Sequence, residues 1–193
     1  MRKSLWPRFV NTKTRWGILS RLIHWLTAAL IIVQVVLASI AAELPLGMRK
    51  LAFLARHKSF GLTLLALVVI RLAWRSMSTV PQLPDTLKAY ERIIARLTHF
   101  TLYVLLFALP LSGWMMSSAR GFSVSWFGLI QLPDLVPKNR ALYEALLGTH
   151  EALAWFHGAV LLIHVAAALK HQFVLGDDVL RRMLPFYRSL GED

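Results

Sequence analysis

The chain of 193 residues contains no cysteine. This absence excludes disulfides, iron–sulfur clusters, thiolate zinc sites and covalently attached c-type haem. Charged residues are also scarce, at 17%, and acidic residues are fewer than half as numerous as basic ones, 10 against 22. Because no thiolate is present, any bound metal must be held by histidine, carboxylate or methionine side chains.

Apolar residues are abundant instead, at 56% of the chain, which is typical of a membrane protein that crosses the bilayer several times. Four runs are long enough to span a hydrocarbon layer of about 30 Å. We therefore expect one all-α membrane domain over residues 1–193, folded as a four-helix bundle. Its transmembrane helices are expected at about 22–42, 53–74, 97–119 and 146–175.

The second run is the least regular, because it opens with Arg56, His57 and Lys58 and carries Arg71 near its end. Its uncharged stretch is short for a span on its own. We interpret these charges as side chains that reach the membrane surface or meet a cofactor, and we take Arg56, Lys58 and Arg71 as candidate cofactor-binding residues.

The distribution of lysine and arginine predicts the orientation of the bundle. Fifteen of these residues lie in the two terminal regions and around the second connection, against seven in the first and third connections. Both tails, residues 1–20 and 176–193, are therefore expected in the cytoplasm. The basic charge is interpreted as a sign of topology and lipid contact, and nucleic-acid binding is not expected.

Four histidines follow one another at intervals of seven residues in the last apolar run, at positions 150, 157, 164 and 171. Seven residues are close to two helical turns, so the four side chains lie along one stripe of one helix. An ionisable side chain in a membrane-spanning helix is costly and usually marks a functional site. Neutral imidazole commonly ligates a metal or a haem iron.

Two haems stacked across the membrane need two ligands on this helix about 14 residues apart, a rise of about 21 Å. This spacing permits His150 with His164, or His157 with His171. A histidine elsewhere in the bundle must lie at the same depth as each of them.

The depths of the other histidines favour the first choice. His57 lies near the outer end of the second span, and its predicted partner is His150. His24 lies about one turn inside the first span, and its predicted partner is His164. A zinc site is the weaker alternative, because zinc needs three or four ligands at one depth. His99 and His157 receive no role, and a hydrogen-bonded core histidine is the simplest reading of each.

Several segments match a known family, and they lie at 23–26, 56–61, 102–110, 150–151, 164–171 and 180–185. On these segments the sequence resembles the bacterial cytochrome b561 family of four-helix dihaem membrane proteins, from about residue 15 to residue 186. The resemblance implies two b-type haems. Its ligand positions fall on His24, His57, His150 and His164.

The resemblance also implies an activity, which is electron transfer across the bacterial inner membrane. In the best-understood members superoxide is oxidised at the periplasmic face and ubiquinone is reduced at the cytoplasmic side. A histidine one heptad beyond the last ligand assists quinone reduction there, and His171 holds this position. A lysine of the cytoplasmic loop assists too, and Lys88 is the nearest candidate.

Two other functions remain open. The chain could be an electron-transfer cytochrome subunit that links the quinone pool to an unidentified periplasmic redox partner. It could also be a histidine-lined metal or proton transporter without haem. The expected partners are membrane lipid, quinone, and either superoxide or a periplasmic electron donor.

Overall fold

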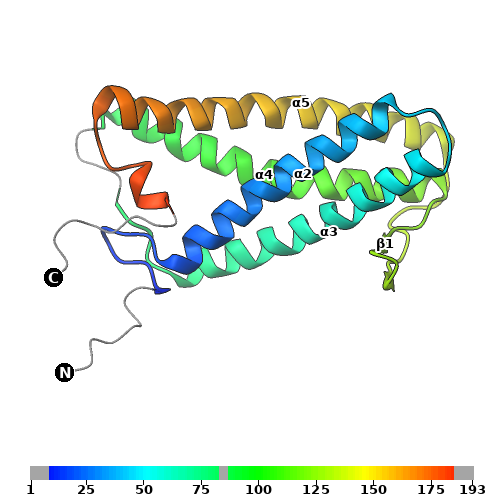
Figure 1. Cartoon of the computed structure of the whole chain (residues 1–193), viewed down its shortest axis with the longest axis horizontal. Helices are drawn as coiled ribbons and strands as arrows, with labels where there is room; N and C mark the ends of the chain where they lie inside the picture. The colour runs from blue at the N-terminus through cyan, green and yellow to red at the C-terminus, as the bar shows by residue number, and fades with distance from the viewer. Residues whose placement is uncertain (1–8, 83–86, 185–193) are drawn as a thin grey trace.

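The computed structural model describes residues 9–82 and 87–184, and it is an all-α bundle of four long helices (Figure 1). Parts of the tails expected in the cytoplasm, at 1–8 and 185–193, lie outside the described residues. The long helices are α2 (Ile18–Glu43), α3 (Met48–Met77), α4 (Ala89–Arg120) and α5 (Arg140–Lys170). Each is long and apolar enough to cross a membrane, as predicted.

Short elements complete the described chain. A π-helical turn, η1 (His171–Leu175), continues α5, and a 3₁₀ turn, η2 (Arg181–Met183), follows it. Between α4 and α5 a small hairpin is formed by β1 (Ser125–Trp126) and β2 (Ile130–Gln131). We call the end with the start of α2 and the end of α5 the inner end, and the opposite end the outer end, following the orientation expected from the basic residues.

The ends of two helices follow ordinary capping chemistry. Gly121 ends α4 with a φ of 85°, a left-handed conformation that glycine adopts without steric cost, and its N–H donates to the carbonyls of Ser117 and Ser118. At the start of α5, the Asn139 side chain accepts a hydrogen bond of 3.0 Å from the Leu142 N–H.

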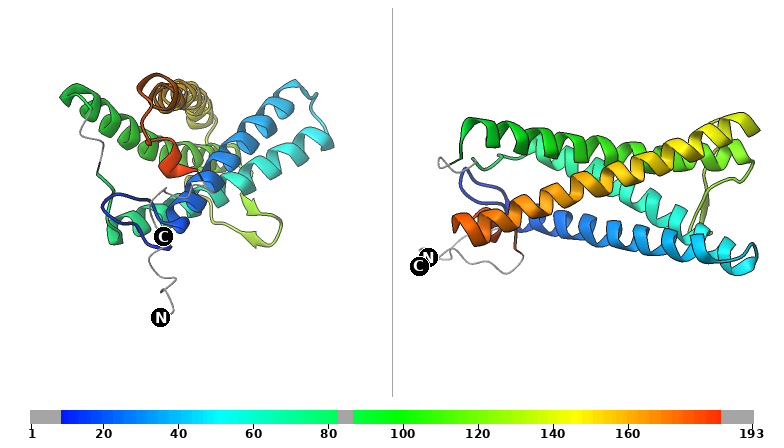
Figure 2. Two further views of the ribbon diagram at one scale, coloured as in Figure 1. Left: turned by 60° about the vertical axis from the view of Figure 1, so that its left-hand side comes forward. Right: turned by 90° about the horizontal axis from the view of Figure 1, so that it is seen from above.

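The helices pack as two antiparallel hairpins. Helix α2 packs mainly on α3, and α4 packs mainly on α5, while α3 joins the two hairpins by contacting α4 (Figure 2). The β1–β2 hairpin is tied to α3, because Trp126 Nε1 donates to Thr63 Oγ1 at 3.0 Å and the Phe127 N–H donates to Ser59 Oγ at 3.0 Å. The outer loop is therefore folded down onto the bundle.

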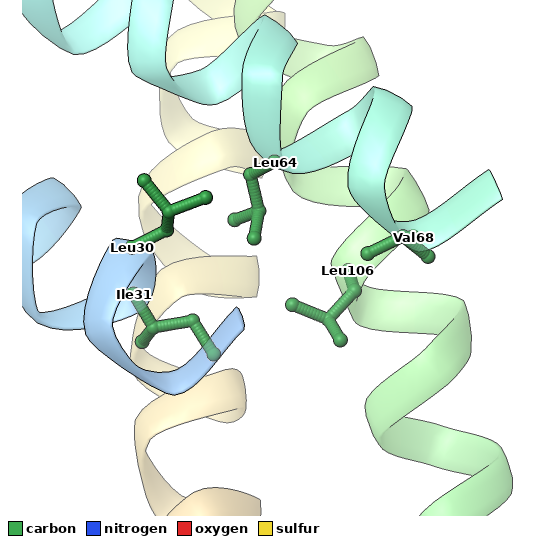
Figure 3. Close-up of a cluster of buried hydrophobic side chains, with 5 residues drawn as sticks. All are labelled: Leu30, Ile31, Leu64, Val68 and Leu106. Atoms are coloured by element: carbon green, nitrogen blue, oxygen red, sulfur yellow. The ribbon is translucent and has the colours of Figure 1, made fainter. Parts of the chain in front are cut away.

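An apolar layer fills the middle of the bundle. It is formed by side chains from three helices: Leu30, Ile31, Leu64, Val68 and Leu106 (Figure 3). Close packing of such side chains fixes the distance between the hairpins at mid-height.

Candidate functional site

Two pairs of imidazoles face each other at the two ends of the bundle. At the outer end, His57 of α3 and His150 of α5 have ring centres 6.5 Å apart. At the inner end, His24 of α2 and His164 of α5 have ring centres 6.3 Å apart. The structure thus brings together the same four residues, in the same two pairs, that the sequence places at matching depths.

The two separations fit one metal between each pair. A metal–nitrogen bond of about 2 Å, with the ring nitrogen about 1 Å from the ring centre, separates two imidazoles on one metal by about 6 Å. Two axial histidines are a ligand set suited to haem iron. Because His150 and His164 are 14 residues apart on one helix, the two sites are about 21 Å apart along the bundle.

In the outer pair, each imidazole Nδ1 lies within hydrogen-bond distance of an oxygen that can accept its proton. His57 Nδ1 lies 3.2 Å from the backbone oxygen of Gln34, which can only accept. His150 Nδ1 lies 2.9 Å from Ser112 Oγ, whose own proton is donated to the Leu109 oxygen at 2.9 Å. Both Nδ1 atoms therefore carry the proton, and each Nε2 lone pair is left available for a metal.

Two glycines leave space for the outer histidines and for the side chain that holds one of them. A Cβ added to Gly113 would lie 3.2 Å from the His150 ring, and one added to Gly61 would lie 3.1 Å from the Gln34 amide. That amide nitrogen donates to the backbone oxygen of His57 at 3.0 Å, so Gln34 holds His57 at both its ring and its backbone. The cavity beside this pair is small, about 80 Å³, so a haem there requires neighbouring side chains to move apart.

The inner pair has a different neighbour. Arg71 Nη2 lies 2.9 Å from His24 Nδ1, and a guanidinium can only donate. In this arrangement Nδ1 accepts and the proton of His24 is on Nε2. Ligation through Nε2 requires the imidazole proton to move to Nδ1 and the hydrogen bond from Arg71 to Nδ1 to break. The Arg71 guanidinium would then be free to bind an anionic group such as a carboxylate.

A cavity of about 500 Å³ lies at the inner end, between the two hairpins. This volume lies within the range of ordinary ligand and cofactor pockets, about 300–1,000 Å³. His24 and His164 line it, together with Arg71 and two further histidines, His99 and His157. Residues 179–180 and 182–184, around and within η2, also line it and form part of its boundary.

The two further histidines were visible in the sequence but had no assigned role. The His99 ring packs edge-on against His164, with ring centres 5.3 Å apart. His157 is only 6% exposed, and its Nε2 has no hydrogen-bond partner among the described residues. A buried imidazole nitrogen without a partner is costly, so the inner cavity is suited to an occupant that has polar groups.

The candidate cofactor-binding cations occupy three different settings. Arg71 lines the inner cavity and Lys58 lines the outer one. Lys58 Nζ donates to Ser117 Oγ at 2.6 Å. Arg56 lies over the Phe53 ring, with its guanidinium carbon 5.6 Å from the ring centre, and is not among the residues lining either of the two cavities described here.

His171 and Lys88, the residues expected at a quinone site, both lie at the inner end, outside the lining of the large cavity. Glu91 connects their two segments. One of its carboxylate oxygens accepts from Lys170 Nζ at 3.0 Å, and the other accepts from the Lys88 backbone N–H at 3.1 Å. Lys88, the residue before α4, is thereby fastened to the end of α5 next to His171.

Comparison with known proteins gives a consistent result. The family described as Prokaryotic cytochrome b561 matches residues 15–186. Cytochrome b561 homolog 2 of Escherichia coli (strain K12) is 36% identical over 184 residues, covering 91% of this chain and 94% of that protein. The probable superoxide oxidase CybB of Yersinia pestis is 30% identical over 167 residues, covering 86% and 94%. Cytochrome b561 homolog 1 of E. coli is 26% identical over 164 residues, covering 84% and 93%.

Proposed function

Because the chain belongs to the prokaryotic cytochrome b561 family, we propose that it carries electrons across the bacterial inner membrane between two b-type haems, each held by one histidine pair. The observation that carries this proposal is the separation of the imidazole rings, 6.3 Å and 6.5 Å, at two depths of one bundle. When bound, the haems supply one-electron oxidation and reduction. If both histidines of a pair held one haem iron, no coordination position would remain open, which would suit electron transfer rather than oxygen binding.

The proposed donor is superoxide at the outer, periplasmic face, and the proposed acceptor is ubiquinone at the inner, cytoplasmic side. Two superoxide anions each give up one electron and leave as dioxygen. One quinone takes up these two electrons and two protons and leaves as the quinol. The relative described as a probable superoxide oxidase, at 30% identity, supports this choice of donor.

Two cations at the outer end suit an anionic donor. The Lys58 ammonium and the Arg120 guanidinium both lie against the Phe122 ring, at 5.8 Å and 5.7 Å from its centre. Lys58 also lines the cavity beside His57 and His150. Positive charge next to the electron-accepting site attracts a small anion and raises the rate at which it arrives.

The inner end suits a larger, neutral acceptor. In our proposal His171 hydrogen-bonds one quinone carbonyl and gives it a proton, and Lys88 adds positive charge as electrons arrive. The Glu91 contacts support this pairing because they hold the Lys88 segment next to the end of α5. His171 and Lys88 lie at the same end of the bundle as the His24–His164 pair, outside the lining of the cavity that this pair shares.

Two measurements on the purified protein test the proposal. A Soret spectrum with a pyridine haemochrome assay should give two b-type haems per chain, and a protein without haem would instead favour the transporter alternative. Superoxide generated in solution should then reduce the haems, and added ubiquinone should reoxidise them. Two haems that superoxide does not reduce would refute the donor and favour a cytochrome subunit with a periplasmic protein donor.

A further inference from the structure

The end of α5 contains a second arrangement of a histidine and a carboxylate. His171 Nδ1 lies 2.5 Å from Asp177 Oδ2, and both side chains are largely buried, at 14% and 16% exposed. A carboxylate can only accept, so this contact places the proton of the imidazole on Nδ1. The other ring nitrogen, Nε2, is the one left to meet a ligand.

The local backbone explains why these two residues meet although six positions separate them. The helix widens into the π turn η1, and Gly176 follows with a φ of 66°, a left-handed conformation. The Asp177 N–H donates to the His171 carbonyl at 3.1 Å, which closes the turn. Asp177 Oδ1 then accepts from the Val179 N–H at 3.0 Å, so both carboxylate oxygens are engaged.

We propose that Asp177 is the positioning residue for His171 in quinone reduction, an inference that rests on the function proposed above. Asp177 Oδ2 holds the ring in one orientation and one tautomer. Its negative charge also balances the imidazolium, so that the ring can carry the second proton on Nε2. The proton on Nε2 passes to one quinone oxygen as an electron arrives, and water from the cytoplasm restores it; the second proton of the quinol comes from solvent.

A neighbouring residue provides a matched control. Asp178 is the next residue in the same turn, is about half exposed, and pairs only loosely with Arg181 Nη1 at 3.8 Å. The Asp177→Asn and Asp178→Asn substitutions each remove one negative charge from the same turn. They differ in whether the carboxylate contacts His171.

The experiment is stopped-flow reoxidation of the reduced, haem-loaded protein by a short-chain ubiquinone. Asp177→Asn should keep both haems and their reduction by superoxide, while the maximal reoxidation rate falls about tenfold or more. The quinone concentration at half-maximal rate should change less than the rate, and Asp178→Asn should stay within about twofold of the parent. Asp177→Glu, which keeps the charge, should recover part of the lost rate.

A double variant that combines Asp177→Asn with His171→Ala distinguishes positioning of the His171 ring by Asp177 from a general effect of the substitution on the structure of the turn. If Asp177 acts through His171, adding Asp177→Asn to His171→Ala should cause no further loss of rate. A further loss, or equal effects of Asp177→Asn and Asp178→Asn, would overturn the inference and leave the proposed function standing. An unchanged rate in His171→Ala itself would remove the proposed quinone site, and the role of Asp177 with it. If Asp177→Asn loses haem, the test passes to Asp177→Glu. A reoxidation rate for Asp177→Glu that is no higher than that of His171→Ala would also overturn the inference.

Discussion

The outer and inner ends of the bundle each hold a pair of histidines, but the hydrogen-bond partners and the cavities beside the two pairs differ. The outer imidazoles, His57 and His150, each donate from Nδ1 to an oxygen and lie beside a cavity of about 80 Å³. The inner imidazole of His24 faces a guanidinium, and its cavity is about 500 Å³. The outer imidazoles leave both Nε2 atoms available to a metal but have little space beside them, whereas the inner end has a larger cavity lined by polar groups.

This difference matches the different tasks proposed for the two ends. A superoxide anion is small and needs only a charged approach to the outer site. A quinone is large, takes up protons, and needs room and a proton donor near the inner site. The comparison therefore predicts that substitutions at one end will leave the other end largely intact.

Loss of a ligand should have the largest effect. If each histidine pair holds one haem, as proposed, His57→Ala and His150→Ala should each remove the outer haem, and His24→Ala and His164→Ala the inner one, because each substitution removes one of the two imidazoles that would hold it. A pyridine haemochrome assay should give one haem instead of two in all four variants. Redox titration should show that the remaining haem belongs to the opposite end.

His157→Leu is the control for these ligand variants. It should keep both haems, and its thermal stability should be unchanged or higher, because the substitution removes a buried nitrogen that has no hydrogen-bond partner within residues 9–82 and 87–184. If His157→Leu lost a haem while His150→Ala kept both, the ligand register on α5 would be displaced by one heptad.

The contacts around the outer pair should have the next largest effect. Ser112→Ala removes the acceptor for His150 Nδ1, so the outer haem should bind about 10–100-fold more weakly while the inner haem is unaffected. Haem titration of the apoprotein measures this. Ser118→Ala, on the same helix, removes a hydroxyl that bonds only to backbone groups in the described contacts and should leave haem binding unchanged.

The inner end can be perturbed through Arg71 instead. A positive charge near an iron stabilises its reduced form, so Arg71→Gln should lower the reduction potential of the inner haem by about 60 mV, equivalent to a tenfold change in equilibrium constant. Potentiometric titration should place the outer haem within error of the parent. Equal shifts of both haems would contradict the assignment of Arg71 to one end.

The sequence predicts the four helices and the two histidine pairs better than it predicts the side chains that contact those histidines. Apolar runs place the four helices, and matched depth selects the two histidine pairs, because both depend on position along the chain. Helix α4 begins at Ala89, eight residues before the expected span, since hydropathy detects the part inside the membrane while backbone hydrogen bonds continue beyond it. The contacts of Gln34 and Ser112 with the histidines come from neighbouring helices, and no spacing within one segment reveals them.

The smallest expected effect tests the charge difference between the two ends. If Lys58 and Arg120 attract superoxide, haem reduction should slow about threefold between 0.01 M and 0.15 M salt, because the Debye length falls from about 30 Å to about 8 Å. Reoxidation by neutral ubiquinone at the inner end should show no such dependence. Lys58→Gln and Arg120→Gln should each reduce the salt dependence of the first reaction and leave the second unchanged. Stopped-flow measurement of both reactions on one preparation provides an internal control. Equal effects of salt on both reactions would indicate a general change in the protein. A rate of reduction by superoxide that does not depend on salt would mean that these two cations have another role.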